Sequence, residues 1–200
     1  ITVGSGYNVA VGGADVDTIT VNGTTPAARG IVLGDNGKLV LDNVGTLLSI
    51  ESTDFASGAA DIIQLTAGTN AVIGGAGADQ ITAGSGSNTI LGDDGQAFFF
   101  ANGDLRLIES INLGNGDDDI ITLQDGSNSV IAGAGNDTIS VGAGSNFVFG
   151  DEGKREVLTD GGGNPTGTTE VTSLNGSVGG QDGITVGSGY NVAVGGADVD

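Results

Sequence analysis

The nonapeptide Gly74–Thr82, GGAGADQIT, contains the pattern on which the rest of the chain is organised. A glycine-rich turn leads to Asp79, and the aliphatic Ile81 follows shortly after it. Another aspartate, Asp61, stands two nonapeptide lengths before Asp79. Such a fixed internal period has to be interpreted before any single motif. The same 18-residue step separates two further pairs of aspartates: Asp119 and Asp137, and Asp182 and Asp200.

An asparagine lies midway in each of these steps, so two kinds of nonapeptide alternate along the chain. The three central asparagines are Asn70, Asn128 and Asn191. If each nonapeptide forms a turn and a short strand, two consecutive nonapeptides complete one coil. The aspartates then stack along one edge and the asparagines along the other. The sequence therefore predicts an all-β solenoid.

The period breaks three times, each time after a Gly-Asp-x-Gly sequence. The interruptions are Lys38–Ser57, Gln96–Leu113 and Lys154–Ser177, and each has two β-prone runs around a turn. We expect three β-hairpins, or wide coils, that interrupt the narrow solenoid. The asparagine nonapeptides also present an outward apolar residue, and such a stripe is usually covered or used for association. Phe98, Phe99 and Phe100 would make the hairpins its cover, and a neighbouring fibre is the alternative.

The two ends of the sequence are identical to each other. Ile1–Asp17 and Ile184–Asp200 both read ITVGSGYNVAVGGADVD, so the sequence begins to repeat with a 183-residue period. Chance does not produce such an identity, so we expect a tandem array whose copies have hardly diverged. We predict one continuous solenoid segment over 1–200. Its modules are 1–61, 62–119 and 120–183, and 184–200 begins the next identical repeat.

The composition favours a cation-binding structural protein over other classes. The net charge is −20, with 25 Asp and Glu against 5 Lys and Arg, and self-repulsion on this scale opposes a compact state unless cations offset it. Five basic residues are too few for nucleic-acid binding. Without His or Cys, a Ser-His triad, a Cys nucleophile and a His-ligated zinc are impossible within this sequence. Paired carboxylates such as Asp93-Asp94 lie in repetitive turns, so we expect no enzyme. No apolar run approaches the ~20 residues of a transmembrane helix.

The nonapeptide G-G-x-G-x-D-x-U-x, where U is a large aliphatic residue, resembles the RTX (repeats-in-toxin) calcium-binding repeat. Gly74–Thr82 fits at every position, and Ala132–Ser140 has Ala132 in place of the first glycine. Gly12–Thr20 has Asp15 in place of the third glycine. The resemblance implies a parallel β-roll with Ca²⁺ held between successive turns on one edge. It also implies secretion by the type I route and an extracellular or cell-surface location.

The turn residues suit calcium chemistry. Glycine accepts positive φ and so lets a tight turn aim its carbonyls inward. Calcium takes 6–8 oxygen ligands, and carbonyls with carboxylates supply them. We expect several Ca²⁺ per 183-residue repeat, between the aspartates of each 18-residue pair, with the Gly-Asp-x-Gly aspartates as a terminal half-site. The predicted metal residues are Asp17, Asp61, Asp79, Asp119, Asp137, Asp182, Asp200, Asp35, Asp93 and Asp151.

Two interpretations remain for the asparagine edge. Its side chains could form a ladder of amide hydrogen bonds, or they could bind calcium weakly. The ladder is favoured because a neutral amide is a poorer calcium ligand than a carboxylate. The candidates for the ladder are Asn8, Asn70, Asn88, Asn128, Asn146 and Asn191.

The sequence therefore predicts an extracellular, calcium-stabilised structural repeat of a giant secreted bacterial protein. It would form a stalk, fibre or matrix filament that serves adhesion or a biofilm scaffold. Its expected partners are calcium and neighbouring identical repeats, including fibres associated side by side. One alternative is the calcium-dependent secretion and folding domain of an RTX toxin or enzyme. A weaker alternative is ice binding, which a thermal-hysteresis assay would test.

Overall fold

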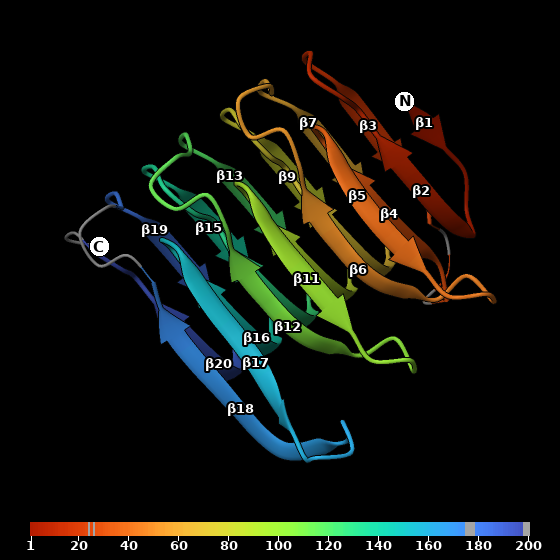
Figure 1. Cartoon of the computed structure of the whole chain (residues 1–200). Helices are drawn as coiled ribbons and strands as arrows, with labels where there is room; N and C mark the ends of the chain where they lie inside the picture. The colour runs from red at the N-terminus through yellow and green to blue at the C-terminus, as the bar shows by residue number, and fades with distance from the viewer. Residues whose placement is uncertain (24, 26, 175–178, 198–200) are drawn as a thin grey trace.

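The structure is a computed structural model that describes residues 1–23, 25, 27–174 and 179–197. Every regular element among these residues is a β-strand, and none is a helix. No helix that could span a membrane occurs in this part of the chain. The strands form three layers (Figure 1).

Two of the layers are parallel sheets of seven strands each. The chain alternates between them, so that one strand from each sheet makes one coil, and there are seven coils. The first sheet contains β1 (Thr2–Val3), β3 (Thr18–Val21), β7 (Ile62–Leu65), β9 (Gln80–Ala83), β13 (Ile120–Leu123), β15 (Thr138–Val141) and β19 (Gly183–Val186). The second sheet contains β2 (Tyr7–Val11), β4 (Arg29–Leu33), β8 (Gly68–Ile73), β10 (Gly86–Leu91), β14 (Gly126–Ile131), β16 (Gly144–Phe149) and β20 (Gly189–Val194). Parallel sheets linked in this way agree with the β-roll that the resemblance implied.

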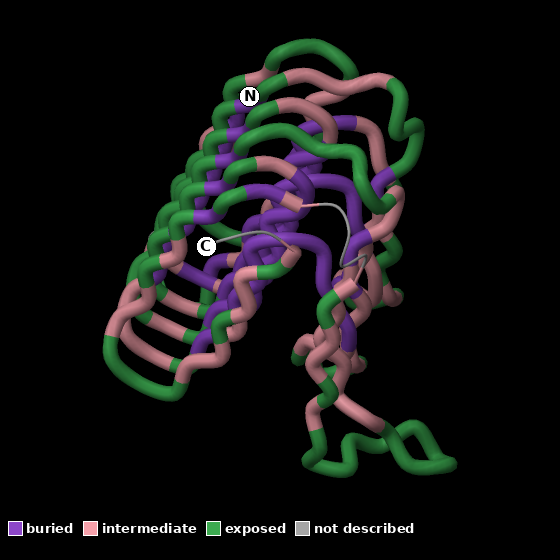
Figure 2. The backbone as a smooth tube through the Cα atoms, turned by 90° about the vertical axis from the view of Figure 1, so that its left-hand side faces the viewer, coloured by how far each residue is buried: buried purple, intermediate pink, exposed green. Residues whose placement is uncertain are grey.

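The core of the roll follows from the alternation of apolar and polar residues in these short strands. Successive side chains of a strand point to opposite faces. In the first sheet, Ile63, Ile81 and Ile121 are fully buried, whereas the next residues, Gln64, Thr82 and Thr122, are exposed. The inward residues of the second sheet, such as Val72 and Ile90, complete the same cluster. Figure 2 shows the buried residues as stripes that run along the roll.

The third layer is a six-stranded antiparallel sheet built from the three interruptions. Its hairpins are β5 (Gly37–Leu41) with β6 (Leu47–Ser52), β11 (Gly95–Phe99) with β12 (Leu105–Ser110), and β17 (Gly153–Thr159) with β18 (Pro165–Ser173). Neighbouring hairpins also pair, β6 with β11 and β12 with β17. The prediction of three hairpins is confirmed. The end of the third interruption, residues 175–177, lies outside the described residues.

The hairpin sheet covers the apolar outer face of the second sheet, as the sequence predicted. Its residues Leu47, Ile50, Ala97 and Ile108 pack with the outward residues of the roll. Burying one large aliphatic side chain contributes about 1.5–3 kcal/mol, so this second core matters for stability. Of the phenylalanines expected in this cover, half-buried Phe99 packs against the second core, and its neighbour Ala97 is fully buried within it. The outward residues that are covered are Ile31, Leu33, Ala71, Ile73, Leu91, Ile131 and Phe149.

The hairpins leave the roll at one edge, where each second-sheet strand turns back to the first sheet. The short turn Gly74–Asp79 has six positions, from Gly74 at position 1 to Asp79 at position 6. An interruption is inserted between positions 2 and 3. In the first one, Gly34 and Asp35 occupy positions 1 and 2, and Gly58–Asp61 supply positions 3 to 6. The backbone pairing supports this alignment, since Gly34 N–H donates to the carbonyl of Ile73.

Candidate metal centre

Six aspartates at position 6 form a ladder along this edge of the roll. The backbone N–H of each of the first five donates to Oδ1 of the aspartate in the next coil, at 2.7 Å for the first four steps and 2.9 Å for the last. The ladder fixes the register of successive turns and uses one carboxylate oxygen of each acceptor. Its members, in order, are Asp17, Asp61, Asp79, Asp119, Asp137 and Asp182.

The structure brings together the predicted neighbours and also residues that the 18-residue step did not connect. Asp61 bonds Asp79, and Asp119 bonds Asp137, each 18 residues apart. Asp79 bonds Asp119 across 40 residues. The hairpins loop out of the roll, so aspartates on either side of an interruption become neighbours. Asp200, the expected partner of Asp182, lies outside the described residues.

The second carboxylate oxygen of four ladder aspartates is buried without a hydrogen-bond partner among the described residues. These oxygens are Oδ2 of Asp61, Asp79, Asp119 and Asp137. All four side chains are at most 2% exposed. Burying a charged oxygen without a partner costs several kcal/mol, and native proteins rarely leave such a group alone. A row of such oxygens favours the binding of a cation, because a cation accepts their lone pairs.

The pKa values of these carboxyls agree with a shortage of positive charge. Loss of hydration on burial raises the pKa of Asp61 to about 6 and the pKa values of Asp79 and Asp137 to about 8. Burial is also the main cause of the strong rise in the pKa of Asp119, and the neighbouring Asp93 carboxylate adds to it. Without a bound cation, the ladder carboxyls would either be protonated or repel one another, and a divalent cation would stabilise their charged form.

Glycine at position 1 leaves the space in which carboxylate and carbonyl oxygens come together. A Cβ on Gly74 would collide with Oδ2 of Asp79 and with the carbonyl oxygen of Gly92 in the next coil. A Cβ on Gly92 would meet Oδ2 of Asp119 and the carbonyl oxygen of Ala132 in the same way. The turn also needs glycine at Gly75 and Gly77, whose φ angles are 110° and 105°.

These donors fit a hard cation that takes carbonyl and carboxylate oxygens together. No three acidic side chains form a cluster within the described residues, so carboxylates alone would not fill a shell. Calcium takes 6–8 oxygens and accepts backbone carbonyls among them. The turn offers both kinds of oxygen beside the same glycine Cα, which satisfies that requirement.

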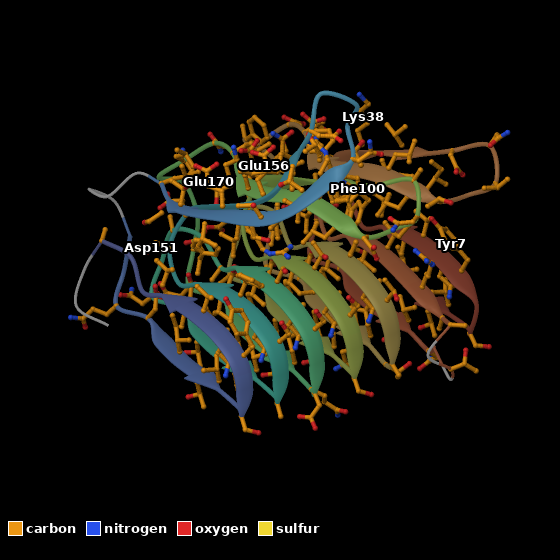
Figure 3. The ribbon with its side chains drawn as sticks, turned by 90° about the horizontal axis from the view of Figure 1, so that it is seen from below. Tyr7, Lys38, Phe100, Asp151, Glu156 and Glu170 are labelled. Carbon is orange, nitrogen blue, oxygen red and sulfur yellow. The ribbon has the colours of Figure 1, made fainter. Side chains whose placement is uncertain are left out.

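The Gly-Asp-x-Gly aspartates occupy position 2 of the interrupted turns and do not form a half-site at the end of the stack. Asp35 accepts hydrogen bonds from the backbone N–H groups of Ala59, at 3.3 Å, and Ala76, at 2.7 Å. Its carboxyl thus lies between the end of its own interruption and the turn of the next coil. Asp93 accepts from Ala134 N–H at 2.7 Å, and Asp151 shows the same arrangement at the edge of the roll (Figure 3).

Burial raises the pKa of Asp35 to about 6 and that of Asp93 to about 9. Oδ1 of Asp93 has no hydrogen-bond partner among the described residues. These buried carboxyls therefore lack compensating positive charge, as the ladder carboxyls do. The expectation of a terminal half-site is corrected, because the interruptions alternate with short turns and so place these aspartates inside the stack.

Two buried acidic residues were missed in the sequence. Asp94 and Glu152 occupy the x position of Gly-Asp-x-Gly and are 6% and 3% exposed. Asp94 accepts from the side-chain amide of Asn112 at 3.0 Å, and Glu152 accepts from Gly114 N–H at 2.7 Å. The bond between Asp94 and Asn112 joins the two ends of the second hairpin. The bond between Glu152 and Gly114 joins the base of the third hairpin to the base of the second. The sequence does carry a signal for these two residues, because the x residue is acidic in two of the three Gly-Asp-x-Gly sequences.

The asparagine edge carries the predicted amide ladder. The side-chain N–H₂ of each of the first four members donates at 2.8 Å to Oδ1 of the asparagine in the next coil. The members are Asn70, Asn88, Asn128, Asn146 and Asn191. Asn8 is not part of it, because Gly30 faces Asn8 in the neighbouring strand and Asn8 donates instead to the carbonyl of Gly4. The ladder uses the amide oxygens that calcium would need on this edge.

Comparison with known proteins identifies the repeat. The family model for the RTX calcium-binding nonapeptide repeat, which describes four copies, matches residues 55–98 and 123–154. These ranges contain Asp61, Asp79 and Asp137 of the ladder and the position-2 residues Asp93 and Asp151. No curated protein and no solved structure matched the chain. The RTX repeat is a structural element that binds Ca²⁺, and the buried carboxylate row fits that ion. The chain therefore contains RTX calcium-binding nonapeptide repeats, and the ion that these repeats bind is Ca²⁺.

Proposed function

We propose that the aspartate edge holds a row of Ca²⁺ ions between successive coils. Asp61, Asp79, Asp119 and Asp137 would each give Oδ2, and the position-1 carbonyls of adjacent coils would add further oxygens. Asp35, Asp93 and Asp151 would contribute at the interrupted turns. Asp17, Asp182 and Asp200 would complete the row toward its two ends. The unpartnered buried oxygens support this assignment.

The ions would make folding depend on the surroundings. Bound calcium supplies positive charge to the carboxylate row, and its binding free energy becomes folding free energy. In a cytoplasm with little free calcium, the aspartates repel one another and the chain stays open for export. Outside the cell, calcium lets the ladder form. RTX proteins are typically secreted by the type I route, and we propose an extracellular or cell-surface location for this chain.

We further propose that the chain is a structural segment of a giant tandem-repeat protein, a stalk, fibre or matrix filament. The observation that carries this proposal is that the identical ends, Ile1–Asp17 and Ile184–Asp200, contain β1 and β2 of the first coil and, except for Gly183, β19 and β20 of the last coil. The modules 1–61, 62–119 and 120–183 would each contribute one short turn and one interruption. Each coil lengthens the roll by about 4.8 Å, so six coils per repeat give about 29 Å.

Circular dichroism of the chain during a calcium titration, followed by a chelator, tests the calcium part. We expect a coil-to-β transition that reverses on chelation and is not reproduced by magnesium, which demands near-octahedral geometry. A β signal that ignores the chelator would contradict calcium-coupled folding. Electron microscopy of chains with one, two and four repeats tests the fibre. Rod length should grow by about 29 Å per repeat, whereas compact particles of constant width and length would favour a secretion domain.

A further inference from the structure

The repeated end sequence occurs in the structure in two environments, at the first and the last coil. In the first coil, β2 pairs with β4 on one side only. In the last coil, β20 pairs with β16, and its other side is open. Each copy therefore has a neighbour on the side where the other copy has none.

Burial differs between the two copies in a complementary way. Ala10 is buried in the first coil, whereas its equivalent Ala193 is exposed in the last coil. Val11 is 41% exposed, whereas its equivalent Val194 packs against the second core, beneath the hairpin sheet. The sequence of this coil is therefore suited to neighbours on both sides and to a cover above β2.

The hairpin sheet has one strand for each coil. Strand β6 contacts β8, β11 contacts β10, and β12 contacts both β10 and β14. The order β18-β17-β12-β11-β6-β5 thus places six strands over consecutive coils, and a 183-residue repeat also adds six coils. The two strands at the ends of this sheet, β5 and β18, have one paired side each (Figure 1). Unpaired edge strands are templates for pairing with another strand.

Consecutive hairpins pair in one register. Gln96 of β11 lies opposite Glu51 of β6, and Lys154 of β17 lies opposite Glu109 of β12. Within the hairpins, Lys38 faces Glu51 and Lys154 faces Thr172. Lys38 thus occupies in its hairpin the position that Gln96 and Lys154 occupy in theirs, and Thr172 occupies the position of Glu51 and Glu109.

We propose that the hairpin sheet continues from one repeat into the next, with β18 of one repeat paired antiparallel to β5 of the following repeat. The partner is a second copy of this chain, and the proposal rests on the tandem array proposed above. Thr172 then lies opposite Lys38 of the next copy, and Val171 lies opposite its Leu39. Val171 and Leu39 both already pack against the second core, on the face that such a pair would share.

This junction accounts for the features left open at both ends. Strand β18 covers the shared coil, so Val11 of the following copy is shielded as Val194 is here. Exposed Val40 and Leu41 on β5 gain a neighbouring strand. All three sheets then continue without a break from one repeat into the next.

An engineered disulfide tests the register, since the chain has no cysteine of its own. The protein is a two-repeat chain, residues 1–183 followed by residues 1–200. The test variant carries Thr172→Cys in the first copy and Lys38→Cys in the second. The positive control carries Glu51→Cys and Gln96→Cys in the second copy, at the equivalent register position. The negative control carries Thr172→Cys in the first copy and Glu51→Cys in the second, two strands apart.

With calcium present and mild oxidation, we expect the test disulfide to close to the same extent as the positive control, and the negative control to stay reduced. A reduced test pair beside a closed positive control would overturn the junction while leaving calcium-coupled folding intact. Closure of the test pair in a chain whose circular dichroism ignores calcium would support the junction and reject the calcium mechanism. The two proposals therefore fail separately.

Discussion

The backbone N–H of Asp79 donates to Oδ1 of Asp119 at 2.7 Å, although 40 residues separate them in the sequence. Asp61 makes the same kind of contact, since its N–H donates to Oδ1 of Asp79 at 2.7 Å across 18 residues. The hydrogen bonds of the aspartate ladder therefore form in the same way whether or not a hairpin is inserted between positions 2 and 3 of the turn. A calcium row can run through interrupted and short turns alike.

Replacing one ladder carboxylate should weaken calcium-induced folding. Asp119→Asn keeps the side-chain oxygen that accepts from Asp79 N–H but removes a buried charge. We expect the calcium midpoint of the circular-dichroism transition to rise on the order of tenfold, because calcium affinity follows the number of charged ligands. Asp54→Asn is the matched control, since Asp54 is exposed and its φ of 60° suits asparagine. A midpoint that Asp119→Asn leaves unchanged would remove this residue from the metal set.

The glycine at position 1 should be required for a spatial reason. In Gly74→Ala the added Cβ would collide with Oδ2 of Asp79 and the Gly92 carbonyl oxygen, both candidate calcium ligands. We expect a higher calcium midpoint and a lower Tm at saturating calcium. Gly161→Ala, where a Cβ would meet nothing within 4 Å, should change neither quantity. Equal behaviour of the two variants would show that the space is not needed.

Lowering the pH should partly replace calcium in stabilising the fold. The folded-state pKa values of Asp79 and Asp137 are raised to about 8, whereas an unfolded aspartate titrates near 4. The folded chain therefore binds more protons, and the stability of the calcium-free fold is greatest below about pH 4 and falls as the pH rises toward 8. Calcium-free protein should show more β-structure at pH 5 than at pH 8 by circular dichroism. Stability that rises over this interval would contradict the assignment of the buried row.

The asparagine ladder should stabilise the roll without setting its metal affinity. Asn128 is fully buried, accepts from Asn88 and donates to Asn146. Asn128→Ala leaves buried amide groups unpaired, at a cost of about 1–3 kcal/mol, so we expect a lower Tm at saturating calcium. Asn8→Ala, outside the ladder, should change the Tm much less. Calorimetry of both variants makes the comparison.

The sequence predicts the elements that obey its period and fails where the fold joins distant segments. The alternation around Ile63 and Ile81 is local, and it correctly predicts which side chains enter the core. The aspartate and asparagine edges also follow from counting along the chain. Neither the bond between Asp79 and Asp119 nor the pairing of β6 with β11 has a local signal, because each depends on hairpins that leave and rejoin one turn.

The position-2 aspartates illustrate a second limit. Asp35 and Asp93 stand in a conspicuous Gly-Asp-x-Gly sequence, yet the sequence alone suggested a half-site at the end of a stack. Their true place depends on the insertion point within the turn, which sets Asp35 against Ala59 and Ala76. The buried acids Asp94 and Glu152 were missed because a single acidic residue beside a turn usually faces solvent.

The uneven spacing of the aspartate ladder has a mechanical consequence. Consecutive ladder steps span 44, 18, 40, 18 and 45 residues. A pull along the roll axis would load the hydrogen bonds between coils end to end, so coils would peel off one after another. An 18-residue coil releases about 60 Å of chain and an interrupted one about 150 Å. A stretched roll would therefore lengthen in alternating short and long steps, and in the proposed filament each hairpin would add length that absorbs a sudden load.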